Sequence, residues 1–186
     1  MRKLKTAEIE RLTKEEAKRS PGHPVVGILE DIRSIHNVGS IFRTAEAASL
    51  TELILTGITG TPEHRMFRKA ALGAQDVVKW RHEADTIAAI IHLKQSGWTV
   101  AALEITDTPR YVAELRSGDF PLALVVGNEV TGVSDAVLSH CDFAVEIGQY
   151  GSKHSLNAAV AFGIAAFGIV ERYRYLNEQV VLDSKE

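Results

Sequence analysis

Short apolar runs alternate with helical segments along most of the chain, and this alternation limits the fold more than any other feature. The runs that we expect to form strands cover residues 25–29, 52–57, 77–80, 99–105, 122–127 and 143–148. Helical patterns cover residues 37–49, 64–72, 85–96, 111–115, 134–140 and 155–177. Several strands are apolar on both faces, which is typical of a parallel sheet with helices packed on both sides. The sequence therefore predicts an α/β fold on a mostly parallel, six-stranded sheet.

The chain length and the positions of Pro and Gly residues predict one main domain with a short addition at each end. With 186 residues, the chain is long enough for a single domain with a substantial core. Residues 1–23 have the pattern of a basic, helical extension that ends at the stretch "SPGHP". We predict the main domain over residues 24–177 and a tail over residues 178–186.

Residue usage argues against disulfides, zinc sites and membrane insertion. Cys141 is the only cysteine, so the chain can form neither an internal disulfide nor a zinc site built on cysteines. The charged N-terminus lacks the apolar core of a signal peptide. The longest apolar run, 158–170, is too short to span a bilayer. We expect a cytoplasmic protein with no membrane segment and no metal site.

Charge is distributed unevenly, although the net charge is only −3. Residues 1–25 carry seven Lys and Arg against four Glu, and residues 61–82 carry five against two acidic residues. The basic residues of the first zone are Arg2, Lys3, Lys5, Arg11, Lys14, Lys18 and Arg19. Such zones are either phosphate-contacting patches or solvated helix faces, and charge alone favours the second interpretation.

The loops that follow the strands are the expected ligand site, because ligands bind at the carboxyl ends of the strands in sheets of this class. The common nucleotide fingerprints are missing from these loops. No G-x-G-x-x-G follows a strand, and "GNEVTGVS" has Val133 where a P-loop needs its phosphate-binding lysine. Nucleotide hydrolysis and dehydrogenation are therefore disfavoured.

The first of three unusual loops joins a strand to the helix at residues 37–49. Asn37 can cap that helix, Gly39 permits a close backbone approach, and Arg43 carries a planar fork suited to phosphate or carboxylate. The alternative is an ordinary capped helix whose arginine extends into solvent. This segment alone does not favour the functional interpretation.

The second and third loops place further polar residues at strand ends. In "VVGNEVTGVS", an apolar strand leads to Glu129 between Gly127 and Gly132, and Ser134 can cap the next helix. In "VEIGQYGSKHSLN", a Gly-rich loop leads to Ser155 and Asn157. A capping role explains Ser155 well. It explains Asn157 poorly, because an Asn beside an apolar helix needs hydrogen-bond partners.

Together the three loops resemble those of the SpoU/TrmH-type RNA ribose 2′-O-methyltransferases, which belong to the SPOUT superfamily. The matching patterns are N-x-G-x-x-x-R-x-A at residues 37–45, G-x-E-x-x-G at 127–132 and S-L-N at 155–157. Residues 68–78, "RKAALGAQDVV", also match the family's segment between the first two motifs. The resemblance covers roughly residues 25–172, and its strength comes from three motifs in the right order on the right elements.

The resemblance implies a fold, a cofactor and an assembly. The fold would be an α/β knot, in which the C-terminal part of the sheet threads a loop as a trefoil, a rare arrangement. The methyl donor would be S-adenosylmethionine, held largely by backbone groups of Leu103, Gly127, Ile147 and Leu156. The family is dimeric and its site is shared between subunits, so we expect a homodimer that binds RNA.

The resemblance also assigns catalytic positions. Arg43 would act on the substrate ribose, with Asn37, Glu129, Ser155 and Asn157 shaping the site around it. The reaction is an in-line attack of a ribose 2′-hydroxyl on the donor methyl group. Because a guanidinium stays protonated in proteins, we expect Arg43 to clamp the target phosphate or hydroxyl rather than act as a base.

Two departures from the family pattern affect the interpretation. The third motif usually reads I-P-M, whereas this chain has Gly148 and Gln149 after Ile147. The chain also has the short basic extension of residues 1–23, which we call the basic lead, where many rRNA-acting relatives have an additional RNA-binding domain. The lead favours tRNA over rRNA as the substrate. A non-catalytic RNA-binding or assembly factor on the same fold is the remaining alternative.

Overall fold

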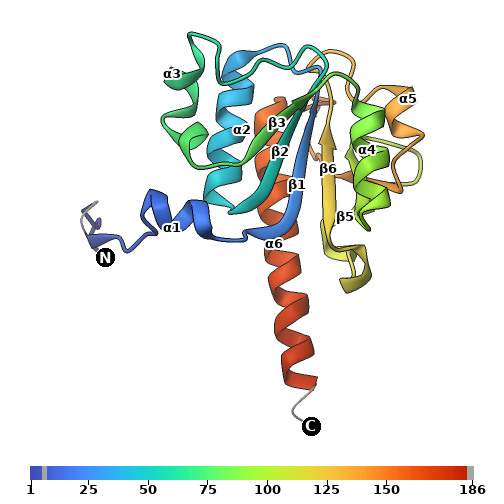
Figure 1. The fold of residues 1–186 in the computed structure, drawn as a ribbon. Helices are drawn as coiled ribbons and strands as arrows, with labels where there is room; N and C mark the ends of the chain where they lie inside the picture. Colours follow the sequence, from blue (N-terminus) through green and yellow to red (C-terminus); the bar gives the residue numbers. More distant parts are fainter. Residues whose placement is uncertain (6–7, 184–186) are drawn as a thin grey trace.

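A central sheet with helices on both faces forms the body of the protein (Figure 1). We describe a computed structural model, which covers residues 1–5 and 8–183. The strands are β1 (His23–Glu30), β2 (Leu50–Thr56), β3 (Trp80–Glu83), β4 (Thr99–Leu103), β5 (Arg110–Tyr111), β6 (Leu122–Val126) and β7 (Phe143–Glu146). Every pairing between them is parallel, in the order β3-β2-β1-β6-β4-β7-β5. The predicted parallel α/β class is confirmed.

The sheet has seven strands, so the prediction of six is wrong. The additional strand, β5, has only two residues, and it pairs with the edge of β7 through Arg110 and Val145. Both of its side chains are exposed, so no apolar pattern marks it in the sequence. The short helix expected at 111–115 is instead one 3-10 turn, Val112–Glu114.

Strand β3 begins at the end of the apolar run that we expected to form it. The run at 77–80 supplies core contacts, because Val78 packs into the core just before the strand starts at Trp80. The strand itself, "WRHE", lies at the sheet edge and is polar. An edge strand pairs on one side only, so it does not need the apolar character that identifies central strands.

Helices pack on both faces of the sheet. They are α1 (Lys14–Arg19), α2 (Ile35–Ala47), α3 (Phe67–Ala71), α4 (Thr86–Gln95), α5 (Asp135–Leu138) and α6 (Ala158–Asp183). Helices α2, α3 and α6 bury apolar residues in one core cluster, and α4 and α5 in the cluster on the other face. Gly39 lets α2 approach α3, because a Cβ there would lie 2.4 Å from Cβ of Ala70.

Serine and asparagine side chains cap α2, α5 and α6, but not always where we expected. Ser34, not Asn37, caps α2 by accepting from the backbone N–H of Asn37. Ser134 caps α5 as predicted. At α6, Asn157 takes the capping position proposed for Ser155, and its Oδ1 accepts from the N–H groups of Ala159 and Val160. Asn157 therefore has a structural reason to precede an apolar helix.

The strand order places a switch point between β1 and β6. The chain leaves β1 toward β2 and β3, whereas β6 leads on to β7 on the other side of the sheet. Parallel strands end at the same edge, and ligands in such sheets bind where the strand order reverses. The loops after β1, β4, β6 and β7 therefore meet at one end of the molecule.

Both ends of the chain extend away from the body in Figure 1. Helix α6 continues to Asp183, beyond the predicted domain boundary at residue 177, and residues 184–186 of the predicted tail lie outside the described part of the chain. Within the predicted N-terminal extension, helix α1 buries no residue. None of the described helices is long and apolar enough to cross a membrane.

Candidate active site at the strand ends

Glu129 ties the loop after β6 to the start of α2. Its Oε2 accepts from the backbone N–H of Arg33 at 3.0 Å, and its Oε1 accepts from the N–H of Ser34 at 3.0 Å. The side-chain amide of Asn37 donates to the same Oε1 at 2.8 Å. Three donors from the first motif loop thus converge on one carboxylate of the second.

Asn157 extends this network to the third motif loop. Its Nδ2 donates to Oδ1 of Asn37 at 3.1 Å. Because Nδ2 of Asn37 already faces Glu129, the Asn37 amide can have only one orientation. A single chain of hydrogen bonds, Glu129–Asn37–Asn157, therefore joins all three motifs.

The hydrogen bonds keep Glu129 ionised. Burial raises the pKa of the carboxyl, but the bonds from Arg33 N–H, the Asn37 amide and Ser34 N–H outweigh burial and hold the pKa below its usual value. A lowered pKa in the folded state stabilises the fold above the unfolded-state pKa. That contribution is lost as the pH falls through the lowered value. The network is therefore intact at neutral pH.

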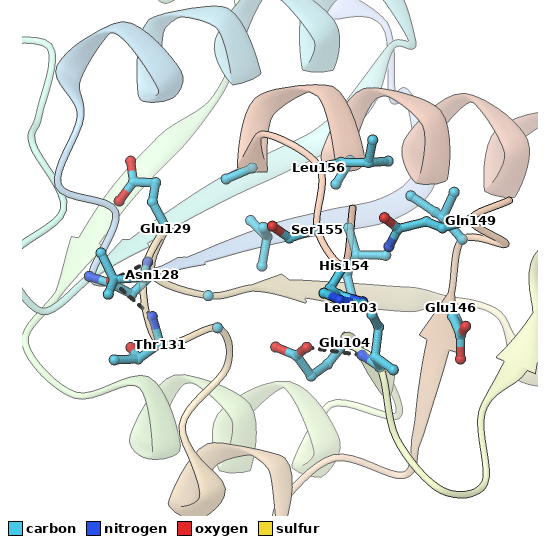
Figure 2. Close-up of a pocket in the computed structure, with 18 of the residues that line it drawn as sticks. Leu103, Glu104, Asn128, Glu129, Thr131, Glu146, Gln149, His154, Ser155 and Leu156 are labelled. Carbon is cyan, nitrogen blue, oxygen red and sulfur yellow. Dashed lines mark hydrogen bonds between the residues drawn. The ribbon is translucent and has the colours of Figure 1, made fainter. Parts of the chain in front are cut away.

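A cavity of about 290 Å³ lies beside this network (Figure 2). It is lined by the loops after β4, β6 and β7 and by the start of α6. All four residues that the resemblance assigns to the cofactor, Leu103, Gly127, Ile147 and Leu156, line it, and so do Ser155 and Glu129. Asn37 and Asn157 do not line the cavity. They are connected to it by hydrogen bonds, from Asn157 to Asn37 and from Asn37 to Glu129.

The cavity wall is built by a close approach of backbone to backbone. A Cβ on Gly127 would lie 2.2 Å from the carbonyl carbon and oxygen of Gly132 and from the nitrogen of Val133. Gly132 itself has φ of +69°, a conformation that favours glycine. The two glycines of the second motif are thus required to fold the loop back on the end of β6.

Sequence reasoning missed several polar residues of the cavity, and Glu104 is one of them. We expected the strand to include residue 104, but β4 ends at Leu103, which leaves Glu104 in the loop. Glu146, Gln149 and His154 also line the cavity. The signal in the sequence was a carboxylate at the carboxyl end of an apolar strand, where ligands bind in this fold class.

Arg43 lies apart from the other predicted site residues. It lies six positions after Asn37 on α2, which corresponds to about 9 Å of helix rise and about 240° of rotation. It is exposed and lines a second cavity, of about 670 Å³, together with Arg11, Lys14 and Phe167. Within one chain, the structure therefore brings together Asn37, Glu129 and Asn157 but does not bring Arg43 to the first cavity.

The two basic zones of the sequence meet beside the second cavity. Asp76 forms ion pairs at 3.3 Å with Lys14 of the first zone and with Arg68 of the second. The hydrogen bond from Lys14 is the main reason that the pKa of Asp76 is lowered. Arg11, Lys14, Arg43 and Arg68 thus surround one region of the surface, which we call the basic face. No cluster of potential metal ligands occurs among the described residues.

Known proteins that are similar to this chain include RNA methyltransferases. Residues 24–167 match the model of the SpoU rRNA Methylase family. The 23S rRNA (guanosine-2'-O-)-methyltransferase RlmB of Pseudomonas aeruginosa is 30% identical over 164 residues, which are 88% of this chain and 65% of that protein. The chain thus spans slightly less than two thirds of the length of this curated relative.

Two solved structures share the fold. One is described as giving insights into the 2-OH methylation of C/U34 on tRNA. It has a TM-score of 0.71 and 26% identity, and the match covers 84% of this chain and 99% of that one. The other is an AdoMet-bound rRNA methyltransferase from Sinorhizobium meliloti, with a TM-score of 0.72 and 24% identity over 83% of this chain and 59% of that one.

Proposed function

Because the chain belongs to the SpoU rRNA Methylase family, we propose that it is an S-adenosylmethionine-dependent RNA methyltransferase that modifies a ribose 2′-hydroxyl. The observation that carries the proposal is the hydrogen-bonded chain Glu129–Asn37–Asn157, which joins the three motif loops next to a cavity. A hydrogen-bonded network of this kind keeps the loops in a fixed geometry around a ligand.

The cavity fits the proposed cofactor in its chemistry. Its wall consists largely of backbone at strand ends, brought close by Gly127 and Gly132, and it carries the carboxylates of Glu104 and Glu146. Leu103, Ile147 and Leu156 provide apolar surface. S-adenosylmethionine has an aromatic base, hydroxyls and positive charge, and these groups match that mixture. When bound, the cofactor supplies the methyl group.

The remaining work of the reaction falls to side chains that position the RNA. A ribose hydroxyl is a weak nucleophile, and correct placement of the reacting atoms accounts for much of enzymatic acceleration. Arg43 holds the target phosphate or hydroxyl with its planar fork. Asn157 uses one of its two amide hydrogens for Asn37, so one remains for a ligand. Ser155, at the cavity wall, offers a hydroxyl.

The separation of Arg43 from the first cavity supports a homodimer with shared sites. Helix α6 exposes the apolar side chains of Val160, Ile164 and Phe167, each by roughly half, at a spacing that places them on one face of the helix. Phe167 belongs to the same cavity as Arg43. A second copy packed on this face would cover apolar surface close to Arg43 and could bring Arg43 to the partner's cofactor cavity. We also propose that the C-terminal part of the sheet threads a loop to form the trefoil knot that the family resemblance implies.

We therefore predict that the protein sediments as a dimer at micromolar concentration. Burying the Val160–Ile164–Phe167 face removes apolar area from water, which stabilises the association. Replacing Ile164 with Glu should shift the species toward the monomer, and Ile91→Glu, at a similarly exposed position on α4, should not. A wild-type chain that sediments at 20.3 kDa would contradict the prediction.

We favour tRNA over rRNA as the substrate. One solved structure that shares the fold is described as concerning 2-OH methylation of C/U34 on tRNA, at 26% identity over 84% of this chain. The short basic lead is consistent with this choice. We also expect the protein to be cytoplasmic, where it would meet such a substrate.

The basic lead should add RNA affinity without choosing the target nucleotide. Phosphate contacts position a protein but carry little sequence information. Removing residues 1–20 should weaken RNA binding and reduce the slope of log affinity against log salt. In a single-stranded region, the slope should fall by about 0.7 for each phosphate that the truncated protein no longer neutralises. The melting temperature should change little, because α1 buries no residue.

A variant that removes two positive charges of the lead without shortening the chain refines this measurement. The pair Arg11→Gln with Lys14→Gln should reproduce much of the decrease in affinity, and Arg116→Gln, far along the chain from the basic face, should not. An unchanged salt slope, together with a lower melting temperature, would mean that the lead packs on the core and does not bind RNA.

Mapping of 2′-O-methyl sites tests the proposed function most directly. Total RNA from cells with and without the gene should differ at one or a few ribose positions, and purified protein should restore these methyl groups with S-adenosylmethionine. The RNA class that changes decides between tRNA and rRNA. Cofactor binding without methylation of any RNA would favour a non-catalytic RNA-binding factor.

A further inference from the structure

Glu104 is a carboxylate in the proposed cofactor cavity that none of the three motifs includes. It follows Leu103 directly at the end of β4. In Figure 2 its carboxylate points from this strand end toward the loop that carries Thr131. A charged side chain in this position requires an explanation, because water solvates a carboxylate better than a protein cavity does.

Two backbone donors hold the Glu104 side chain in place. Its Oε1 accepts from the N–H of Ile105 at 2.9 Å, and its Oε2 accepts from the N–H of Val133 at 2.9 Å. An ionised carboxylate can accept about four hydrogen bonds, so about half of its capacity remains available. The group is therefore oriented by the protein but not saturated by it.

The loop after β6 is shaped around this carboxylate. A Cβ on Gly132 would lie 2.2 Å from Oε2 of Glu104, so a larger residue at position 132 would displace the Glu104 carboxylate from its present position. The position of Glu104 thus depends on the same loop that carries Glu129. Its negative charge is fixed at the junction of two of the cavity's walls.

No basic side chain neutralises this charge. Among the described residues, none of those lining the cavity is Lys or Arg, and Glu104 makes no ion pair within 4.0 Å. Two other carboxylates, of Glu129 and Glu146, line the same cavity, and His154 is its one ionisable base. Glu129 is already engaged by Arg33, Ser34 and Asn37. The cavity is therefore negative overall, and a cationic ligand would balance it.

We propose that Glu104 is a charge-selecting residue, which makes the cavity prefer the positively charged sulfonium of S-adenosylmethionine to the neutral thioether of S-adenosylhomocysteine. The two molecules otherwise carry the same ionisable groups, and they are the methyl donor and the spent product of the proposed reaction. Selection of this kind favours exchange of product for new donor. The inference rests on the proposed function and specifies how its cofactor site discriminates.

The competing explanation is that Glu104 only joins two loops. In that case a substitution disturbs the cavity for both ligands equally, because both contact the same walls. The ratio of the two affinities separates the explanations. Loss of structure changes both dissociation constants together, whereas loss of charge changes mainly the constant for the cation.

Calorimetric titration of the full-length protein with each ligand measures this ratio. We expect Glu104→Gln to weaken S-adenosylmethionine binding about tenfold relative to its effect on S-adenosylhomocysteine binding. Glu104→Asp keeps the charge and should keep the wild-type ratio even where both affinities fall. Glu15→Gln, at an exposed glutamate on α1, is the matched control and should leave both affinities unchanged.

A measurement on the wild-type protein covers the case in which Glu104→Gln does not fold. Added KCl screens charge interactions, so it should weaken S-adenosylmethionine binding more than S-adenosylhomocysteine binding. An equal effect of Glu104→Gln on both ligands, or an equal effect of salt where that variant is unfolded, would overturn the role of Glu104 and leave the proposed function standing. A wild-type protein that binds neither ligand would overturn the proposed function itself.

Discussion

Arg43→Ala is expected to reduce single-turnover methyl transfer at least about 100-fold, the usual scale for removal of one group that stabilises a transition state. Affinity for S-adenosylmethionine should stay close to the wild-type value, because Arg43 is proposed to hold the RNA rather than the cofactor and does not line the first cavity of its own chain. Removing an interaction that forms mainly in the transition state lowers kcat more than it raises KM. Rapid-quench assays with labelled cofactor, alongside calorimetry, provide both quantities.

Two further arginine variants sharpen this result. Arg43→Lys keeps the charge without the planar fork and should recover only part of the activity. Arg116→Ala, at an exposed arginine away from both cavities, should behave as wild type. Weakened cofactor binding in Arg43→Ala, with methyl transfer restored at saturating S-adenosylmethionine, would show that this residue belongs to the cofactor site.

Gly127→Ala should abolish detectable cofactor binding. The added Cβ would meet the backbone of Gly132 and Val133 at 2.2 Å, and backbone atoms cannot move aside as the end of a long side chain can. The loop after β6 would shift, and the positions of Glu129 and of the Val133 N–H that holds Glu104 would shift with it. We expect the free energy of unfolding to fall by about 1–3 kcal/mol, as in other overpacked sites.

Gly151→Ala is the matched control for this substitution. A Cβ at Gly151 meets nothing within 4 Å, although this glycine belongs to the loop that follows β7. Calorimetric titration and thermal melting of both variants should show a large effect for the first and almost none for the second. Wild-type affinity in Gly127→Ala would mean that the cofactor binds elsewhere.

Mixing the two inactive variants tests whether the site is shared. A dimer of one Arg43→Ala chain and one Gly127→Ala chain contains an intact Arg43 and an intact cofactor cavity, but on different chains. Activity should reappear on mixing if Arg43 serves the partner's cavity. No recovery in a mixture that demonstrably exchanges subunits would place both functions within one chain.

The central strands could be read from the sequence, whereas the edges of the sheet could not. Strands β1, β2 and β6 have buried residues on both faces, so each sequence contains a run of consecutive apolar residues. Strands β3 and β5 lie at the edges and are polar or very short. The pattern that identifies a strand is a consequence of burial, and it weakens where burial is incomplete.

The motif loops could also be located from the sequence, but the roles of single residues within them could not. Spacing placed Asn37, Glu129 and Asn157 at the ends of elements that a parallel sheet brings to one edge. It did not show that Ser34 caps α2 or that Asn157 caps α6. Neighbouring polar residues at a helix start can each serve as the cap, and the backbone geometry decides between them.

What the sequence determined by itself was local: which segments are apolar, which loops carry unusual polar residues, and which known family shares their order. Only the tertiary structure decided which of these residues meet. Glu129 and Asn37 are 92 positions apart, and Asn157 and Asn37 are 120 positions apart, yet each pair shares a hydrogen bond. Strand order creates such contacts, whereas the rise and rotation of helix α2 separate Arg43 from Asn37. Periodicity reports the environment of each residue along its own segment and contains no information about which strand ends become neighbours.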